Sequence, residues 1–477
     1  MSVEQSAARV FDPWFTAWVS GDVWALTRAA GSDWRDRRLR RLDELLRRAA
    51  AGSPWWARRL RELPRQAASA AERLQQVPTL DKATLMAHFD AAVTDRAIRL
   101  ADARAFARAH GGRGGAYLGR YLVWESSGSR GEPALFVQDA HSLAVGDALS
   151  ALRGPVAQLG PGAVGSRIAL VGAIDGPFAS ILSLQRLRAL NPWIAATTRA
   201  FSLLQRIDVL VAELNEWQPQ VLATYPSMAW VLAQQHRRGA LGLAPRAVWT
   251  GGETLGRACR EAVSAAFGCP VRDSYGASEC LEIASECAAG SLHLNADWVI
   301  LEPVDAHHRP VADGCTGETT LLTNLANHVQ PIVRYDIGDR VRIVPESCSC
   351  GCPLPVIEVE GRSDDVLSLP GNAGQAVHLS PLALSTVIED EADLYQFRIE
   401  QRGAAELRVE LFGTDARDVA RRQRLLRILG RYLNEQGVGD VVLRVLPRDA
   451  APPLGASGKL ARIVRAGPDL ADRQHVR

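Results

Sequence analysis

The chain carries almost no net charge and contains no long run of apolar residues. Its 55 basic and 53 acidic residues leave a formal charge of +2, so we expect no nucleic acid or other strongly charged partner. The most apolar segment, residues 168–184, contains an aspartate and falls short of the roughly 18 apolar residues of a membrane span. The first residues lack the basic start and apolar core of a secretory signal. These features predict a cytoplasmic protein without a membrane span.

Cysteine is also scarce, because eight cysteines in 477 residues do not make a disulfide scaffold. Three of them nevertheless form, with one histidine, a plausible four-ligand zinc set: Cys287, His293, Cys348 and Cys350. Such a site would be structural, since four protein ligands leave no open position for chemistry. Cys352 is an alternative to Cys348 or Cys350, and the other alternative is a loop of reduced thiols without a metal.

A loop rich in serine and glycine lies between two apolar runs, residues 121–124 and 134–137. Small residues let backbone N–H groups approach an anion, and serine hydroxyls add donors. This loop predicts a phosphate site built from Ser126, Ser127, Gly128, Ser129, Arg130 and Gly131. It is not a P-loop of the GxxxxGK[ST] kind, because no Lys-Ser or Lys-Thr pair follows the glycines. A hairpin loop that binds nothing is the alternative.

The pattern along the chain predicts an α/β protein with a large and a small domain. Residues 1–110 have helical spacing, and the arginine run 37–41 is interpreted as the solvated face of an amphipathic helix. Strands at 168–172, 220–224, 246–250 and 270–273 alternate with helical segments, which indicates a layered α/β domain. We expect a helical region at 1–110, a large domain at 111–363 and a small α+β domain at 364–477.

Further motifs follow the serine-rich loop in a fixed order: WTGGE (249–253), DSYGASE (273–279), RYDIGD (334–339), EGRSDD (360–365) and GASGK (455–459). In these motifs the chain resembles the adenylate-forming superfamily of acyl- and aryl-CoA ligases, over roughly residues 40–465. Shorter segments are similar to the phenylacetate–CoA ligase-like branch: SPWW (53–56), PTLDKATL (78–85) and CSCG (348–351).

The resemblance implies roles for individual residues. Glu279 would bind Mg²⁺, Ser278 takes the usual threonine position, and Lys459 would bridge the carboxylate and the α-phosphate. The ribose would be held by Asp339, with Asp336 as a competing candidate, and by Arg362. The turn that packs on the adenine and the ring stacked on it correspond to Gly251, Gly252, Glu253, Tyr275 and Gly276. Asp364 matches the hinge on which the resemblance implies that the small C-terminal domain swings, and Tyr225 is a candidate for the acyl-pocket wall.

The resemblance therefore implies an enzyme that uses ATP and Mg²⁺ to convert a small carboxylic acid, preferably an aryl acid, into an acyl-adenylate. The acyl group would then pass to a thiol, with coenzyme A as the leading acceptor. A carrier-protein phosphopantetheine or another nucleophile is the alternative acceptor. The remaining alternatives for the function are a non-catalytic nucleotide-binding protein and a zinc-dependent hydrolase. Two positions depart from the family pattern: Arg130 stands where threonine is usual, and residues 367–375 lack the usual apolar-glycine pattern after the hinge.

Overall fold

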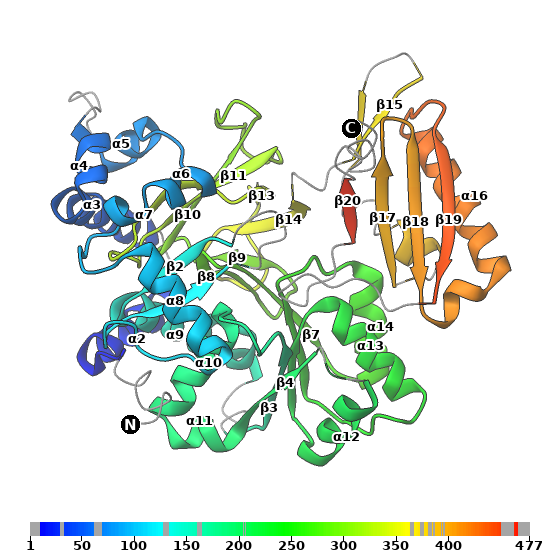
Figure 1. The fold of residues 1–477 in the computed structure, drawn as a ribbon, viewed down its shortest axis with the longest axis horizontal. Helices are drawn as coiled ribbons and strands as arrows, with labels where there is room; N and C mark the ends of the chain where they lie inside the picture. Colours follow the sequence, from blue (N-terminus) through cyan, green and yellow to red (C-terminus); the bar gives the residue numbers. More distant parts are fainter. Residues whose placement is uncertain are drawn as a thin grey trace, which may run out of the picture.

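The computed structural model describes residues 10–28, 33–61, 69–126, 133–159, 165–203, 205, 207–362, 367–372, 376–379, 384, 387–392, 394, 396–449 and 462–465. Within these residues the chain forms a large layered α/β part and a smaller C-terminal part with its own sheet (Figure 1). No helix in the described part is long and apolar enough to cross a membrane.

A nine-stranded sheet runs through the large part in the order β13-β14-β9-β8-β7-β6-β5-β3-β4. One half is parallel and consists of β3 (Ile168–Gly172), β4 (Thr198–Ser202), β5 (Val221–Thr224), β6 (Ala247–Gly251) and β7 (Val271–Ala277). The other half is antiparallel and consists of β8 (Cys280–Glu286), β9 (Leu292–Leu294), β13 (Asp339–Val344) and β14 (Val356–Arg362). The four strands expected from the sequence are confirmed as β3, β5, β6 and β7.

Helices alternate with the parallel strands, as right-handed βαβ crossovers require. They are α10 (Ala179–Leu190), α11 (Pro192–Thr197), α12 (Ile207–Trp217), α13 (Pro226–Arg237) and α14 (Arg257–Phe267). Helix α14 illustrates the pattern, because Cys259, Val263 and Phe267 recur every four residues and are buried on one face. Gly268, in the left-handed conformation, ends this helix.

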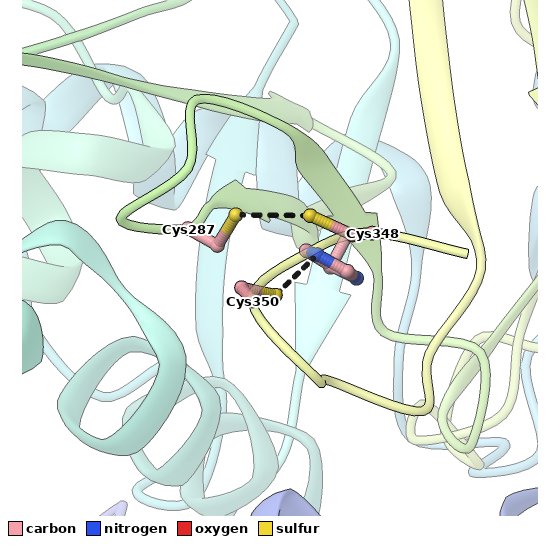
Figure 2. A group of neighbouring side chains, drawn as sticks. Cys287, Cys348 and Cys350 are labelled. Atoms are coloured by element: carbon pink, nitrogen blue, oxygen red, sulfur yellow. Dashed lines mark hydrogen bonds between the residues drawn. The ribbon is translucent and has the colours of Figure 1, made fainter. Parts of the chain in front are cut away.

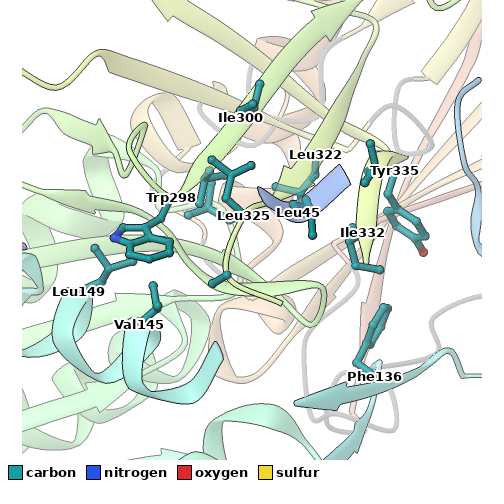
Figure 3. Close-up of a cluster of buried hydrophobic side chains, with 14 of the residues drawn as sticks. Leu45, Phe136, Val145, Leu149, Trp298, Ile300, Leu322, Leu325, Ile332 and Tyr335 are labelled. Carbon is teal, nitrogen blue, oxygen red and sulfur yellow. The ribbon is translucent and has the colours of Figure 1, made fainter. Parts of the chain in front are cut away.

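The first part of the chain is helical, as expected. Its helices are α2 (Pro13–Arg28), α3 (Asp33–Gly52), α4 (Pro54–Arg61), α5 (Ala70–Gln76), α6 (Lys82–Ala87), α7 (Phe89–Ala92), α8 (Leu100–His110) and η1 (Gly111–Arg113). The apolar faces of α2 to α7 join a large core, shown in part in Figure 3, to which α3 contributes Leu45, whereas α8 contributes Ala103 and Ala107 to a smaller separate cluster. A three-stranded sheet of β10 (Val299–Val304), β11 (Thr319–Asn324) and β12 (Ile332–Asp336) packs on the same core. It contributes Leu322 of β11, and the residue just before β10 contributes the Trp298 ring.

The interpretation of the arginine run as a solvated face is wrong for Arg37 and Arg41. Both guanidinium groups pair with the carboxylate of Asp22 on the neighbouring helix α2. Arg41 also donates a 2.7 Å hydrogen bond to the carbonyl of Asp297 and lies 3.5 Å from the ring centroid of Trp298. Counter-charges from elsewhere in the chain therefore turn part of the polar face inward, which helical periodicity cannot predict.

A hairpin of β1 (Leu122–Glu125) and β2 (Leu135–Gln138) flanks the serine-rich loop, and α9 (Ala140–Arg153) with η2 (Pro155–Leu159) follows it. The two apolar runs that border the serine-rich loop in the sequence are therefore strands. Helix α9 begins with a capping box in which Asp139 and Ser142 exchange side-chain and backbone hydrogen bonds.

The C-terminal part has a separate core and a four-stranded sheet in the order β19-β18-β17-β20. Its elements are β15 (Leu367–Pro370), β16 (Ala376–Leu379), η5 (Val387–Glu391), β17 (Phe397–Arg402), β18 (Glu406–Phe412), η6 (Thr414–Arg417), α16 (Val419–Glu435), β19 (Val442–Arg448) and β20 (Ile463–Arg465). The expected α+β composition of this part is confirmed. The expected domain boundary at 363/364 lies outside the described residues.

Candidate functional site

Several of the predicted site residues come together where parallel strands of the large sheet end, the usual place for ligands in open α/β sheets. Strand β6 ends at Gly251, and β7 carries Tyr275 beside it. A Cβ at Gly251 would lie 2.8 Å from the hydroxyl oxygen and 3.0 Å from the carbonyl oxygen of Ser274, and Gly252 has φ +78°. These two glycines let the chain turn tightly against β7.

A buried hydrogen bond links the same two strands at the residue before Gly251. Thr250 donates from Oγ1 to Oδ1 of Asp273 at 2.7 Å. Burial raises the pKa of Asp273 to about 7, so its carboxyl is partly protonated near neutral pH. The bond therefore keeps the ends of β6 and β7 in a fixed relation.

Glu253 follows the glycine turn, and its carboxylate holds the start of helix α13. Glu253 Oε2 accepts a 3.0 Å hydrogen bond from the Ser227 backbone N–H, and Oε1 accepts one of 3.1 Å from the Ser227 hydroxyl. An acidic group is favourable at this helix end. Glu253 thus connects the turn to α13, whose N-cap residue is Tyr225.

Tyr225 packs against the core between the parallel strands and their helices. Burial, followed by the charge of Glu253, raises the pKa of its hydroxyl to about 12. The tyrosine is therefore neutral and lies close to the glycine turn.

The segment Tyr275–Glu279 forms the end of β7 and a two-residue turn into β8. Ala277 is paired with Cys280 across the hairpin, so Ser278 and Glu279 are the turn residues. Gly276 cannot be replaced without displacement of the chain, because a Cβ there would lie 2.0 Å from the carbonyl oxygen of Leu281.

Two predicted nucleotide contacts are joined directly. The Tyr275 hydroxyl donates a 2.6 Å hydrogen bond to Oδ2 of Asp339, 64 positions along the chain. Asp339 begins β13 and lies opposite Arg362 of β14 in the strand register. The fold thus brings the YGASE, RYDIGD and EGRSDD motifs to one place.

The competing candidate Asp336 is bound to neighbouring residues. Its Oδ1 accepts hydrogen bonds from the Thr319 hydroxyl and, at 2.9 Å, from the Gly338 N–H. Its Oδ2 lies 3.1 Å from Nε2 of His308. Asp336 therefore shapes the turn into β13.

Some predicted residues cannot be placed in this site. Ser126 lies at the neck of the serine-rich loop, where its N–H donates to the Ala134 carbonyl at 2.8 Å and its Oγ accepts from the Ala134 N–H at 2.9 Å. The remaining loop residues, the hinge and the late lysine lie outside the described residues, and these are Ser127, Gly128, Ser129, Arg130, Gly131, Asp364 and Lys459. The side chain of Arg362 is also outside the described part.

The predicted metal ligands are clustered. Ligand atoms of Cys287, His293, Cys348 and Cys350 all lie within 4.8 Å of one another. The two sulfur atoms of Cys287 and Cys348 are 3.7 Å apart, and Cys350 Sγ is 3.2 Å from Nε2 of His293 (Figure 2). Three thiols and an imidazole are the donor set of a structural zinc site.

The surroundings of this cluster suit metal binding. His293 Nδ1 lies 2.9 Å from the carbonyl oxygen of Leu354, a contact that orients the ring and leaves Nε2 toward the thiols. Hydrogen bonds from Ser291 and from the Cys350 backbone lower the pKa of Cys348 to about 6, which favours the thiolate. Cys352 is outside the four-residue group, packs against the main core and donates its N–H to Cys350 Sγ at 3.4 Å.

The sequence analysis missed Trp124 and Asn324, which both bond to the turn at Ser278 and Glu279. Trp124 lies two residues before the serine-rich loop, which is a local signal that could have drawn attention to it. Asn324 ends β11 and has no comparable signal in the sequence.

Comparison with solved structures identifies the class of fold. 2-Hydroxyisobutyryl-CoA ligase in its postadenylation state, in complex with 2-HIB-AMP, is 19% identical with a TM-score of 0.67, and the match covers 90% of this chain and 88% of that one. An anthranilate CoA ligase in complex with anthranoyl-AMP is 15% identical with a TM-score of 0.54, covering 71% and 64% of the two chains. The protein has the mixed α/β fold of the adenylate-forming CoA ligases.

Curated relatives add a more specific likeness, although no protein-family model matches the chain. The phenylacetate-coenzyme A ligase of Thermus thermophilus is 28% identical over 214 residues, which are 42% of this chain and 46% of that protein. Protein CapK of Staphylococcus aureus is 28% identical over 144 residues, 30% of each chain. The matched regions span less than half the length of these relatives. The resemblance to the adenylate-forming superfamily is confirmed.

Proposed function

We propose that this protein is an AMP-forming acid–thiol ligase. A carboxylate oxygen of the acid attacks the α-phosphorus of ATP, and pyrophosphate leaves. The thiol sulfur of coenzyme A then attacks the carbonyl carbon of the acyl-adenylate, AMP leaves, and the thiol proton passes to solvent. The observation that carries the proposal is the 2.6 Å hydrogen bond from Tyr275 to Asp339, because it joins two separate motifs of this chemistry near the end of β7 and at the start of β13.

The first step brings two anions together, so catalysis depends on charge neutralisation and in-line positioning. In the proposed site Tyr275, Gly251 and Gly252 border the adenine, while Asp339 accepts from the ribose hydroxyls with Arg362 beside it. Glu279 holds Mg²⁺ with Ser278 next to it, and one carboxylate with phosphate oxygens and waters suits this ion. Lys459 neutralises charge at the α-phosphate, and Asp364 is the pivot between the two half-reactions.

The acid is proposed to be aromatic and the acceptor to be coenzyme A. The name of one relative, phenylacetate-coenzyme A ligase, supports both choices. A carrier-protein thiol is the second candidate for the acceptor. The expectation of a cytoplasmic enzyme stays a prediction.

The test is a pyrophosphate-exchange screen of the full chain over aryl and aliphatic acids, followed by product analysis with and without coenzyme A. We expect acid-dependent exchange that needs Mg²⁺, and a thioester only when the thiol is present. Exchange with an acid but no thioester on coenzyme A would shift the acceptor to a carrier protein. No exchange with any acid, and no binding of ATP, would refute the proposal.

We further propose that Cys287, His293, Cys348 and Cys350 hold a structural Zn²⁺. The distances between their ligand atoms and the orientation of His293 by Leu354 support this assignment. Bound zinc would stabilise the fold and take no part in the reaction, because the four side chains complete a tetrahedral shell.

A further inference from the structure

The two-residue turn between β7 and β8 is held by side chains from outside its own hairpin. The Trp124 indole N–H donates a 2.8 Å hydrogen bond to the Ser278 carbonyl, 154 positions away. The Asn324 side-chain amide donates one of 3.0 Å to the Glu279 carbonyl, 45 positions away. Both turn carbonyls therefore have fixed directions.

Trp124 connects this turn to the serine-rich loop. It is 2% exposed, lies on β1 and is paired with Phe136 of β2. Two residues further along, Ser126 closes the neck of the loop through two hydrogen bonds with Ala134. The indole thus bridges the start of the proposed phosphate loop and the turn that carries Glu279.

Asn324 makes a second connection between the same parts. Its Oδ1 accepts a 3.0 Å hydrogen bond from the Ala326 N–H, so the amide is oriented with Nδ2 toward Glu279. The loop that follows Asn324 is bound to β2. Gln330 accepts from the Val137 N–H at 2.8 Å and donates to the Leu135 carbonyl at 3.1 Å, and Asn327 donates to the Val137 carbonyl at 2.8 Å.

We propose that Trp124 and Asn324 are positioning residues that fix the Ser278–Glu279 turn against the neck of the phosphate loop. They set where the Glu279 carboxylate meets the metal ion on the ATP phosphates. This inference rests on the proposed function of the same site. Displacement of a reacting group by about 1 Å costs as much as two orders of magnitude in rate, so bonds that hold such a turn have a large effect on activity.

The decisive variant is Trp124→Phe, which removes the N–H donor and keeps a large aromatic ring. Trp56→Phe is the matched control. Trp56 is 0% exposed, and its Nε1 is buried without a hydrogen-bond partner among the described residues. Both substitutions replace a buried indole with a smaller phenyl ring, but only Trp124→Phe removes a hydrogen bond to the turn.

We expect Trp124→Phe to raise the Mg²⁺ concentration for half-maximal pyrophosphate exchange by about three- to tenfold, the effect of one hydrogen bond. Asn324→Leu, which acts from the other side of the turn, should shift the same quantity. The KM for the acid should change much less. Trp56→Phe should lower thermal stability and leave the Mg²⁺ dependence at the wild-type value.

The outcomes separate this inference from the proposed function. If the wild type shows acid-dependent exchange and both turn variants retain its Mg²⁺ dependence, the positioning role is refuted and the proposed function stands. An equal shift in Trp56→Phe would also refute it, because loss of packing would then be sufficient. If the wild type binds no ATP in the presence of Mg²⁺ by calorimetry and shows no exchange, both the function and the inference fail.

Discussion

The imidazole rings of His141 and His328 lie 4.6 Å apart, and His141 also stacks on Phe15 with 4.0 Å between ring centroids. Burial, followed by the neighbouring His141 and Arg48, lowers the pKa of His328 to about 3. Burial likewise lowers the pKa of His141. The folded state therefore binds fewer protons at these rings than the unfolded chain does.

This pair predicts a loss of stability in mild acid. The stabilising contribution is complete above the unfolded histidine pKa of about 6.5 and falls as the pH drops toward the lower folded pKa, by up to about 1.4 kcal/mol per pH unit for one ring. Chemical denaturation measures the free energy of unfolding at pH 7 and at pH 5. From pH 7 to pH 5 this free energy should decrease more for the wild type than for His328→Asn. The buried carboxyls of Asp273 and Glu282 have raised pKa values of about 7 and 8 and act in the opposite sense. Their contribution cancels in the comparison, and equal losses would contradict the prediction.

Asp339→Asn should weaken productive use of ATP. The substitution removes a charged acceptor from the proposed ribose contact, which predicts a decrease in kcat/KM for ATP of about ten- to a hundredfold. Steady-state exchange kinetics with ATP varied will measure this. Asp313→Asn is the control, because Asp313 is exposed. A decrease below about twofold for Asp339→Asn would remove this residue from the site.

Lys459→Ala should reduce the rate of adenylation by about two to three orders of magnitude, since its ammonium acts where charge develops on the α-phosphate. Binding of ATP, measured by calorimetry, should remain close to that of the wild type. Adenylation within about threefold of the wild type would show that this lysine has another role.

Protein purified without added metal should contain about one zinc per chain by elemental analysis. Cys287→Ser should lose the metal and lower Tm, whereas Cys315→Ser should do neither, because Cys315 is exposed and lies outside the four-ligand group. Absence of zinc together with three reactive thiols at the cluster, those of Cys287, Cys348 and Cys350, would contradict the assignment.

Asp364→Pro should separate the two half-reactions, because proline fixes φ and removes an N–H at the proposed pivot. We expect pyrophosphate exchange to persist and thioester formation to fall steeply. An equal loss of both in a folded variant would mean that the pivot lies elsewhere. Unchanged thioester formation would mean that the protein does not use this rotation.

Local patterns in the sequence were sufficient for many of the elements, whereas the residues of the nucleotide site were assigned through the resemblance and stay predictions. The parallel strands and the β1–β2 hairpin follow from short-range spacing, whereas the zinc-type cluster joins two local pairs whose members Cys287 and Cys348 lie 61 positions apart. Long-range partners were not predictable in this way. Arg41 is half-buried and bonds to Asp297, 256 positions away, and Asn324 reaches a turn 45 positions before it. For Glu253 the WTGGE motif matched the family pattern. Its hydrogen bond to Ser227 was not predictable, because it depends on the position of helix α13 relative to the glycine turn.

The strand pairing around Gly276 limits how this site can change. Between the pairs Tyr275–Ala284 and Ala277–Cys280, strand β7 has one residue while β8 has three, and the Leu281 carbonyl occupies the space of a side chain at position 276. In a directed-evolution library for new acids, variants at position 276 should be lost to misfolding whatever substrate is supplied. Active variants should therefore carry their substitutions on the surrounding helices and keep glycine at position 276 of the hairpin.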